Sequence, residues 1–240
     1  MRAKTNLNAF NRNKVYSIIT GYYGPDTARA KFFDLWWKNT DKFSKPKDIF
    51  VINVNSDFCP EEKWGKWIDL SHNLGHVHDL DVNDYYNKKF GGWSMSFIMG
   101  AYLAYSNNTD LIYKEQDCLA FGDWVSELYS HEKEIVVGHP VHADGQALEQ
   151  SLFLVRHSAI LDFVNAYTNL ESNDAGKDFI RPEGKFSKIL NQSFSNRFTF
   201  TKMGYGRSRP QNFKESLESG EAFYIQKLTE EELLINNIAE

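Results

Sequence analysis

The sequence predicts an α/β fold, in which one domain contains a mainly parallel sheet flanked by helices on both faces. Two observations predict this class. Short apolar runs of strand length alternate along the chain with segments of helical periodicity, which is typical of a largely parallel sheet covered on both sides. The chain of 240 residues, 42% of them hydrophobic, is long enough to close one sizeable core, and it contains no internal repeat or low-complexity linker.

The strands are predicted from apolar runs that end in turn residues such as glycine, proline and asparagine. A strand that begins at Thr109 leads up to two acids, Glu115 and Asp117. The other strands are expected over Val15–Thr20, Ile49–Asn53, Trp64–Leu70, Glu134–Val137 and Ser151–Arg156, with Phe198–Met203 as the last recognisable element.

Helices are predicted where apolar residues recur at helical spacing behind a capping residue. Asp26 is the expected N-cap of a helix that runs through Trp37. Pro182 and Glu183 are expected in the first turn of another helix, because proline is tolerated there and an acid favours the helix dipole. The remaining helices are expected over Met95–Tyr105, Asp123–Tyr129 and Ser158–Tyr167.

Charge and composition exclude several classes of protein. With 27 basic and 32 acidic residues the net charge is -5, so the chain lacks the broad basic surface of a nucleic-acid binder. Cys59 and Cys118 have no CxxC spacing, which argues against a disulfide scaffold and a structural zinc site. The sequence contains no transmembrane run and no signal peptide, and we expect a cytoplasmic protein with a flexible tail at 1–13, a domain at 14–228 and a helical tail at 229–240.

The most informative stretch is the strand that ends in Glu115 and Asp117. Side chains two residues apart in a strand point to the same side, so these carboxylates can face one ligand together. Open α/β sheets bind ligands at strand ends, and two hard oxygen donors suit Mn²⁺ or Mg²⁺ holding a diphosphate. The alternative is a strand that ends in two solvated acids.

The order of elements up to this acid pair resembles the nucleotide-sugar half of a GT-A type glycosyltransferase, whose sheet is Rossmann-like. Glu115-Gln116-Asp117 stands where that family keeps its DxD motif, as an ExD variant. The chain departs from the family in this glutamate and in having no histidine beyond His157, where some members have a late metal ligand. The resemblance implies a metal-dependent transferase that moves a sugar from a nucleoside diphosphate sugar to a hydroxyl acceptor, such as a glycan.

The resemblance also implies a donor site. Asp117 is the first expected ligand of the metal. Glu115 is the second, and its alternative is to hold ribose or a metal-bound water. Arg207 and Arg209, in a Gly-rich turn, are candidate clamps for the diphosphate, because guanidinium forks match phosphate oxygens; an ordinary surface turn is the alternative. The remaining expected contacts with base, ribose and donor sugar are Thr20, Tyr22, Tyr23, Gly92 and Ser94.

Catalysis in an inverting member would require a base for the acceptor hydroxyl. Glu183 is the first candidate and Glu149 is the second; the alternative for Glu183 is an acid that only stabilises the helix dipole. Two other function classes remain open, namely a nucleotidyltransferase acting on sugar phosphates and a non-catalytic nucleotide or sugar binder.

Overall fold

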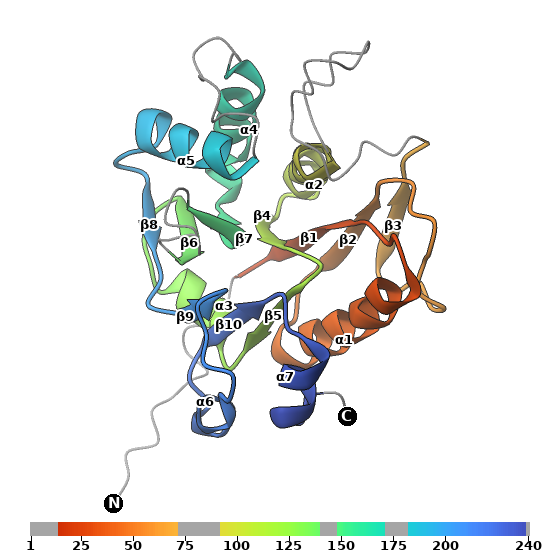
Figure 1. Ribbon diagram of the computed structural model, residues 1–240. Coiled ribbons are helices and arrows are strands. Elements are labelled where there is room, and N and C mark those ends of the chain that lie inside the picture. Colours follow the sequence, from red (N-terminus) through yellow and green to blue (C-terminus); the bar gives the residue numbers. More distant parts are fainter. Residues whose placement is uncertain (1–13, 72–91, 140–147, 171–181, 239–240) are drawn as a thin grey trace, which may run out of the picture.

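A mixed sheet forms the centre of the structure (Figure 1). The structure is a computed structural model that describes residues 14–71, 92–139, 148–170 and 182–238. Within these residues the sheet has seven strands in the order β3-β2-β1-β4-β7-β6-β8. They are β1 (Tyr16–Tyr22), β2 (Asp48–Asn53), β3 (Lys66–Asp69), β4 (Asp110–Lys114), β6 (Ile135–His139), β7 (Glu149–Val155) and β8 (Phe198–Phe200).

The strand directions confirm a mainly parallel sheet. β1 pairs in parallel with both β2 and β4, and β3 pairs in parallel with β2. β7 runs antiparallel to β4 and β6, and β8 returns to the parallel direction beside β6. β7 is therefore the one reversed strand of this sheet among the described residues.

A second, smaller sheet follows directly after the acid pair. It consists of β5 (Cys118–Phe121), β10 (Phe223–Gln226) and β9 (Gly204–Gly206) in that order. β10 is antiparallel to β5 and parallel to β9. Residues from the middle and the end of the chain are thereby brought side by side, as Figure 1 shows.

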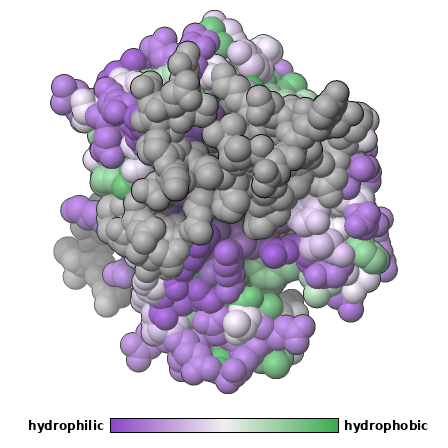
Figure 2. All heavy atoms as spheres, turned by 45° about the horizontal axis from the view of Figure 1, so that its top comes forward, coloured by the Kyte–Doolittle hydropathy of each residue, from purple (hydrophilic) through white to green (hydrophobic). Residues whose placement is uncertain are grey.

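Helices cover both faces of the central sheet. α2 (Gly92–Ser106), α4 (Ile160–Asn169) and α5 (Pro182–Ser193) pack on one face, and α1 (Thr27–Phe43) packs on the other face together with the second sheet (Figure 1). The shorter helices are α3 (Trp124–Tyr129), the 3₁₀ helix η1 (His157–Ala159), α6 (Lys214–Ser219) and α7 (Glu230–Ile235). On the face turned forward in Figure 2, the described surface is mostly hydrophilic with small separate hydrophobic spots.

The predicted elements are largely confirmed, with corrections at the end of the acid-bearing strand and in the last part of the chain. Asp26 caps α1 as expected, since its Oδ1 accepts a hydrogen bond from the Arg29 amide at 2.8 Å. The acid-bearing strand ends earlier than predicted, at Lys114, so that Glu115–Asp117 form a turn. The last predicted element shrinks to β8, and β9, α6 and β10, which were not predicted, follow it.

The tails contain little that tests the expected boundaries. Residues 1–13 lie outside the described residues, and α7 lies in the expected helical tail, with a capping box formed by Thr229 and Glu232. Within the described part of the chain, no helix is long and apolar enough to cross a membrane.

A buried lysine ties α1 to the strand that leads to the acid turn. Lys114 Nζ donates to Asn39 Oδ1 at 2.9 Å and to Thr40 Oγ1 at 2.8 Å, and it lies 4.9 Å from the centroid of the Trp36 ring. Burial lowers the pKa of Lys114 to about 7. Because Asn39 Oδ1 also accepts from the Ala120 amide at 3.0 Å, this network fixes α1, β4 and β5 relative to one another.

Candidate functional site

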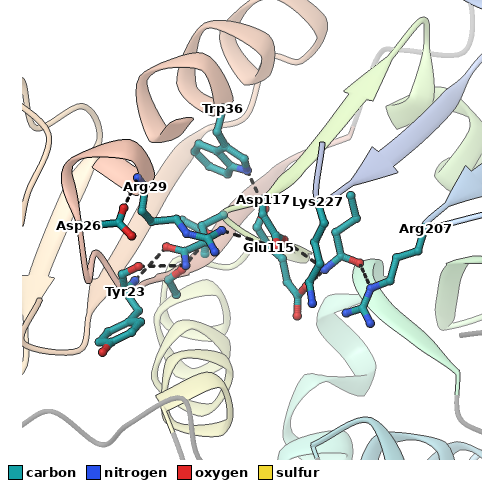
Figure 3. A network of polar contacts seen from close by, with 12 residues as sticks. Tyr23, Asp26, Arg29, Trp36, Glu115, Asp117, Arg207 and Lys227 are labelled. Atoms are coloured by element: carbon teal, nitrogen blue, oxygen red, sulfur yellow. Dashed lines mark hydrogen bonds and ion pairs between the residues drawn. The ribbon is translucent and has the colours of Figure 1, made fainter. Parts of the chain in front are cut away.

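The acid turn Glu115–Asp117 lies at the carboxyl end of β4 and is held there by backbone hydrogen bonds (Figure 3). The Glu115 amide donates to the Ser151 carbonyl at 2.8 Å, and Trp36 Nε1 donates to the Glu115 carbonyl at 2.8 Å. The Lys227 amide donates to the Asp117 carbonyl at 3.2 Å. The backbone of the turn is thus anchored to β7, α1 and the residue that follows β10.

The two carboxylates meet at a single amide group. Gln226 Nε2, at the end of β10, donates to Glu115 Oε2 and, at 3.1 Å, to Asp117 Oδ1. Gln226 Oε1 in turn accepts from Arg207 Nε at 3.1 Å. The acids therefore face one point, as expected, although a turn rather than a strand brings them together.

The charge around Glu115 is strongly negative. Burial raises the pKa of Glu115 well above its ordinary value, and the neighbouring charges of Asp117, Glu149 and Glu183 raise it further, while Arg207 acts in the opposite direction. Three other acids thus lie within electrostatic reach of Glu115. A bound cation would relieve this repulsion, which is the electrostatic condition for a metal or phosphate–metal site.

Arg29 lies in the first helical turn of α1, and its side chain reaches the acid turn. Its Nη1 lies 3.7 Å from Asp117 Oδ2, and its side chain is 37% exposed while that of Asp117 is 11% exposed. Figure 3 shows Arg29 and Arg207 on opposite sides of the acids. The arrangement places one guanidinium on each side of the point where the carboxylates meet.

Gln116, between the two acids, joins the acid turn to the loop after β1. It accepts from the Tyr23 amide at 2.9 Å through Oε1 and donates to the Tyr23 carbonyl at 3.2 Å through Nε2. This pair of hydrogen bonds fixes the β1–α1 loop beside the acids. Sequence reasoning missed the role of Gln116, since a lone glutamine in a turn carries no signal of its own.

The two tyrosines expected to contact the donor lie in different environments. Tyr22 is buried in the core, where its hydroxyl donates to the Phe58 carbonyl at 2.9 Å and its ring lies edge-on to Phe33. Its ring therefore has no free face for a base, so it is not brought to the site. Tyr23 is partly buried in the loop next to Gln116, which leaves it as the candidate for that contact.

Thr20, Gly92 and Ser94 lie in the packed interior. Thr20 is fully buried on β1, and Gly92 opens α2 with its carbonyl accepting from Ser96 Oγ at 2.7 Å. Ser94 Oγ is 2.7 Å from the Tyr167 hydroxyl. The described contacts thus engage Ser94 with α4 and do not place it at the acid turn.

The two candidate arginine clamps also differ. Arg209 donates to Glu232 Oε2 at 2.6 Å and to the carbonyls of Gln226 at 2.7 Å and Lys227 at 2.8 Å, and its side chain is only 9% exposed. It therefore holds the end of β10 to α7. Arg207 is the guanidinium that acts directly on the acid site.

The two candidate bases come from different elements. Glu149 begins β7 and is almost fully buried, and Glu183 lies partly exposed in the first turn of α5. Both charges raise the pKa of Glu115, so both side chains are near the acid turn. The two side chains differ in exposure, since only Glu183 is partly open to solvent.

The donor set suits a cation that arrives with a ligand of its own. Among the described residues, no group of three or more histidine, cysteine, aspartate or glutamate side chains forms a metal site. Mg²⁺ and similar ions in nucleotide sites typically bind one or two carboxylates and complete their shell with phosphate oxygens and water. Glu115 and Asp117 fit this pattern, with Asp117 only slightly exposed and both carboxylates directed to one point.

The sequence matches no protein-family model and no curated protein sequence. Among solved structures, the glycosyltransferase GlyE of Streptococcus pneumoniae TIGR4 shares 13% identity, with a TM-score of 0.47 over 79% of this chain and 46% of GlyE. A galactosyltransferase LgtC complex has 13% identity and a TM-score of 0.47 over 85% of this chain and 78% of that chain.

A glycosyltransferase involved in glycosylation of the major capsid of PBCV-1 has 10% identity and a TM-score of 0.48, over 94% of this chain and all of that chain. The chain spans about half the length of the GlyE structures, since it covers 46% of one and 55% of the other. At these identities and scores the likeness is one of general architecture, and the activity of this chain has to be argued from its own site.

Proposed function

We propose that this protein is a glycosyltransferase that transfers a sugar from a nucleoside diphosphate sugar to a hydroxyl acceptor such as a glycan, with Mn²⁺ or Mg²⁺ held by Asp117 and Glu115. One observation carries the proposal. The side chains of Glu115 and Asp117 meet at one point at the carboxyl end of β4, beside the loop that follows β1. In open α/β sheets, this edge is where ligands bind.

The chemistry of sugar transfer explains why such a site is useful. When the bond to the sugar breaks, negative charge develops on the departing diphosphate, and a bound divalent cation would stabilise it. Arg207 and Arg29 flank the same point and supply fixed positive charge for the phosphate oxygens. The chain's own part is to hold these groups in place before the donor arrives, so that little reorganisation is needed during the reaction.

Glu183 is the residue that we propose as the base for the acceptor hydroxyl. It lies at the start of α5, partly exposed and near enough to Glu115 to raise its pKa. A carboxylate in that position can take the proton as the hydroxyl attacks the sugar. Glu149, which is buried at the start of β7, is better suited to hold the donor sugar by accepting hydrogen bonds from its hydroxyl groups.

A thermal-shift screen tests the proposed donor. Nucleoside diphosphates and nucleotide sugars are added with and without Mn²⁺, because a ligand that binds only the folded protein raises its melting temperature. We expect a nucleotide-dependent rise that Mn²⁺ increases and that Asp117→Ala abolishes. A variant that responds as fully as the parent would refute the site.

The products test the reaction. Incubation with the best donor from the screen and a mixture of glycan acceptors should release a nucleoside diphosphate. Release of pyrophosphate from a nucleoside triphosphate and a sugar phosphate would instead identify a nucleotidyltransferase. Tight binding of a nucleotide sugar with no turnover on any acceptor would favour a non-catalytic binder.

A further inference from the structure

Gln226 occupies the point at which the two acids meet. Its side chain is 1% exposed, and its backbone is fixed opposite Cys118 in the pairing of β10 with β5, one residue from Asp117. The amide is therefore placed at the acid turn by the fold and not by a flexible loop. Its Nε2 bridges Glu115 and Asp117, as a cation between the two carboxylates would.

The two ends of this amide have different partners. Nε2 donates to carboxylates, whereas Oε1 accepts from Arg207 Nε at 3.1 Å. An amide oxygen is a hard ligand of the kind that Mn²⁺ and Mg²⁺ accept, and an amide nitrogen is not. A half turn about the Cγ–Cδ bond exchanges the two atoms without any change in the backbone.

We propose that Gln226 is the third protein ligand of the cation and that it exchanges roles when the cation binds. In the cation-free protein, Nε2 keeps the two carboxylates together; with the cation bound, Oε1 faces it beside Asp117 and Glu115. This inference rests on the proposed function, since it concerns the same site. It makes Gln226 a binding residue that no acid-x-acid motif would indicate.

The exchange has a consequence for Arg207. When Oε1 turns to the cation, Arg207 Nε no longer donates to Gln226, and this N–H can donate to a phosphate oxygen instead. Cation binding and phosphate binding are thereby coupled through one amide. We expect pyrophosphate to bind the protein more tightly with Mn²⁺ than without it.

Mn²⁺ binding to the metal-free protein tests the proposal without any measurement of activity. Free Mn²⁺ is counted by its electron paramagnetic resonance signal in a titration, and pyrophosphate binding is measured by calorimetry with Mn²⁺ present. Gln226→Leu removes the amide, and we expect it to weaken Mn²⁺ binding at least tenfold. Gln211→Leu is the matched control, since Gln211 is exposed and its side chain donates to Glu231 Oε1 at 3.0 Å, away from the acid turn.

Gln226 could instead only bridge the two carboxylates and compete with the cation for them. Its removal would then leave Mn²⁺ binding unchanged or make it tighter, and that result overturns the proposal. Should Gln226→Leu not fold, Gln226→Asn decides the question, because it keeps a polar amide that is one methylene too short. The same weakening is expected for it, and unchanged or tighter binding overturns the proposal. If the parent protein binds neither Mn²⁺ nor pyrophosphate, the proposed function is refuted as well. If the parent binds both and the Gln226 variants bind them equally well, only the proposed role of Gln226 is refuted.

Discussion

The contact between α2 and β1 gives a sharp prediction about stability, because Gly100 has no room for a side chain. A Cβ atom at this position would lie 2.1 Å from Ile19 Cγ2 and 3.0 Å from Ile19 Cβ and Cγ1. β1 leads to the loop that Gln116 holds beside the acid turn, and α2 packs on the face of the sheet that contains Ile19 of β1. Gly100→Ala therefore tests how closely the helix must pack.

Two effects of Gly100→Ala oppose each other. Alanine is a better helix former than glycine in a helix interior, which would stabilise the protein by about 1 kcal/mol. Overpacking a core costs about 1–3 kcal/mol, and more where the neighbour cannot move. Ile19 is fully buried on a central strand, so we expect the clash to win with a net loss of about 1–2 kcal/mol.

Urea unfolding of the parent and of Gly100→Ala, with thermal melting beside it, measures this difference. For a chain of this size a loss of 1–2 kcal/mol corresponds to a fall of about 2–8 °C in melting temperature. Gly204→Ala is the control, because a Cβ there meets nothing within 4 Å. In the double variant with Ile19→Ala, the cost of Gly100→Ala should vanish. A more stable Gly100→Ala would refute the close packing of α2 on β1.

Three further predictions concern the site. Glu183→Gln should keep the Mn²⁺-enhanced melting shift with the donor while turnover is lost, and retained turnover would exclude it as the base. Gln116→Leu loses two hydrogen bonds to Tyr23 and should cost about 1–2 kcal/mol in urea unfolding; an unchanged midpoint would mean that the loop is held by other contacts. Arg29→Met should strengthen binding of Mn²⁺ alone at low salt, because it removes a competing cation 3.7 Å from Asp117, and weaker binding would contradict that role.

The sequence predicted most of the fold because its signals are local. Asp26 caps α1 through a contact that spans only three residues, and each apolar run marks one strand. The direction of β7 could not be predicted, since a strand buried on both faces carries no pattern that separates parallel from antiparallel pairing. Tyr22 was expected at the donor because the first strand was predicted to end at Thr20, which would place Tyr22 in the following turn. The strand instead runs through Tyr22, and the Tyr22 side chain is buried in the core.

The site was only partly predictable because its key contacts join distant parts of the chain. Glu115 and Asp117 were found from their spacing, but Gln226, which they share, comes 111 and 109 residues later. It ends a strand of four residues that has no motif around it. Arg207 and Arg209 are equivalent in the sequence; in the structure Arg207 donates to the Gln226 side chain, whereas Arg209 donates to Glu232.

The acid turn is an arrangement that costs the folded protein free energy, and this cost is an argument for its function. Buried carboxylates that repel each other are expensive unless they are paired, and a structural turn gains nothing from them. Here the Gln226 amide donates to both carboxylates, and Arg29 Nη1 lies 3.7 Å from Asp117 Oδ2. Burial and the neighbouring acids still raise the pKa of Glu115 well above its ordinary value. A cation at this point, as we propose, would relieve the repulsion between the carboxylates, and a divalent ion would relieve more of it than a monovalent ion because it carries twice the charge.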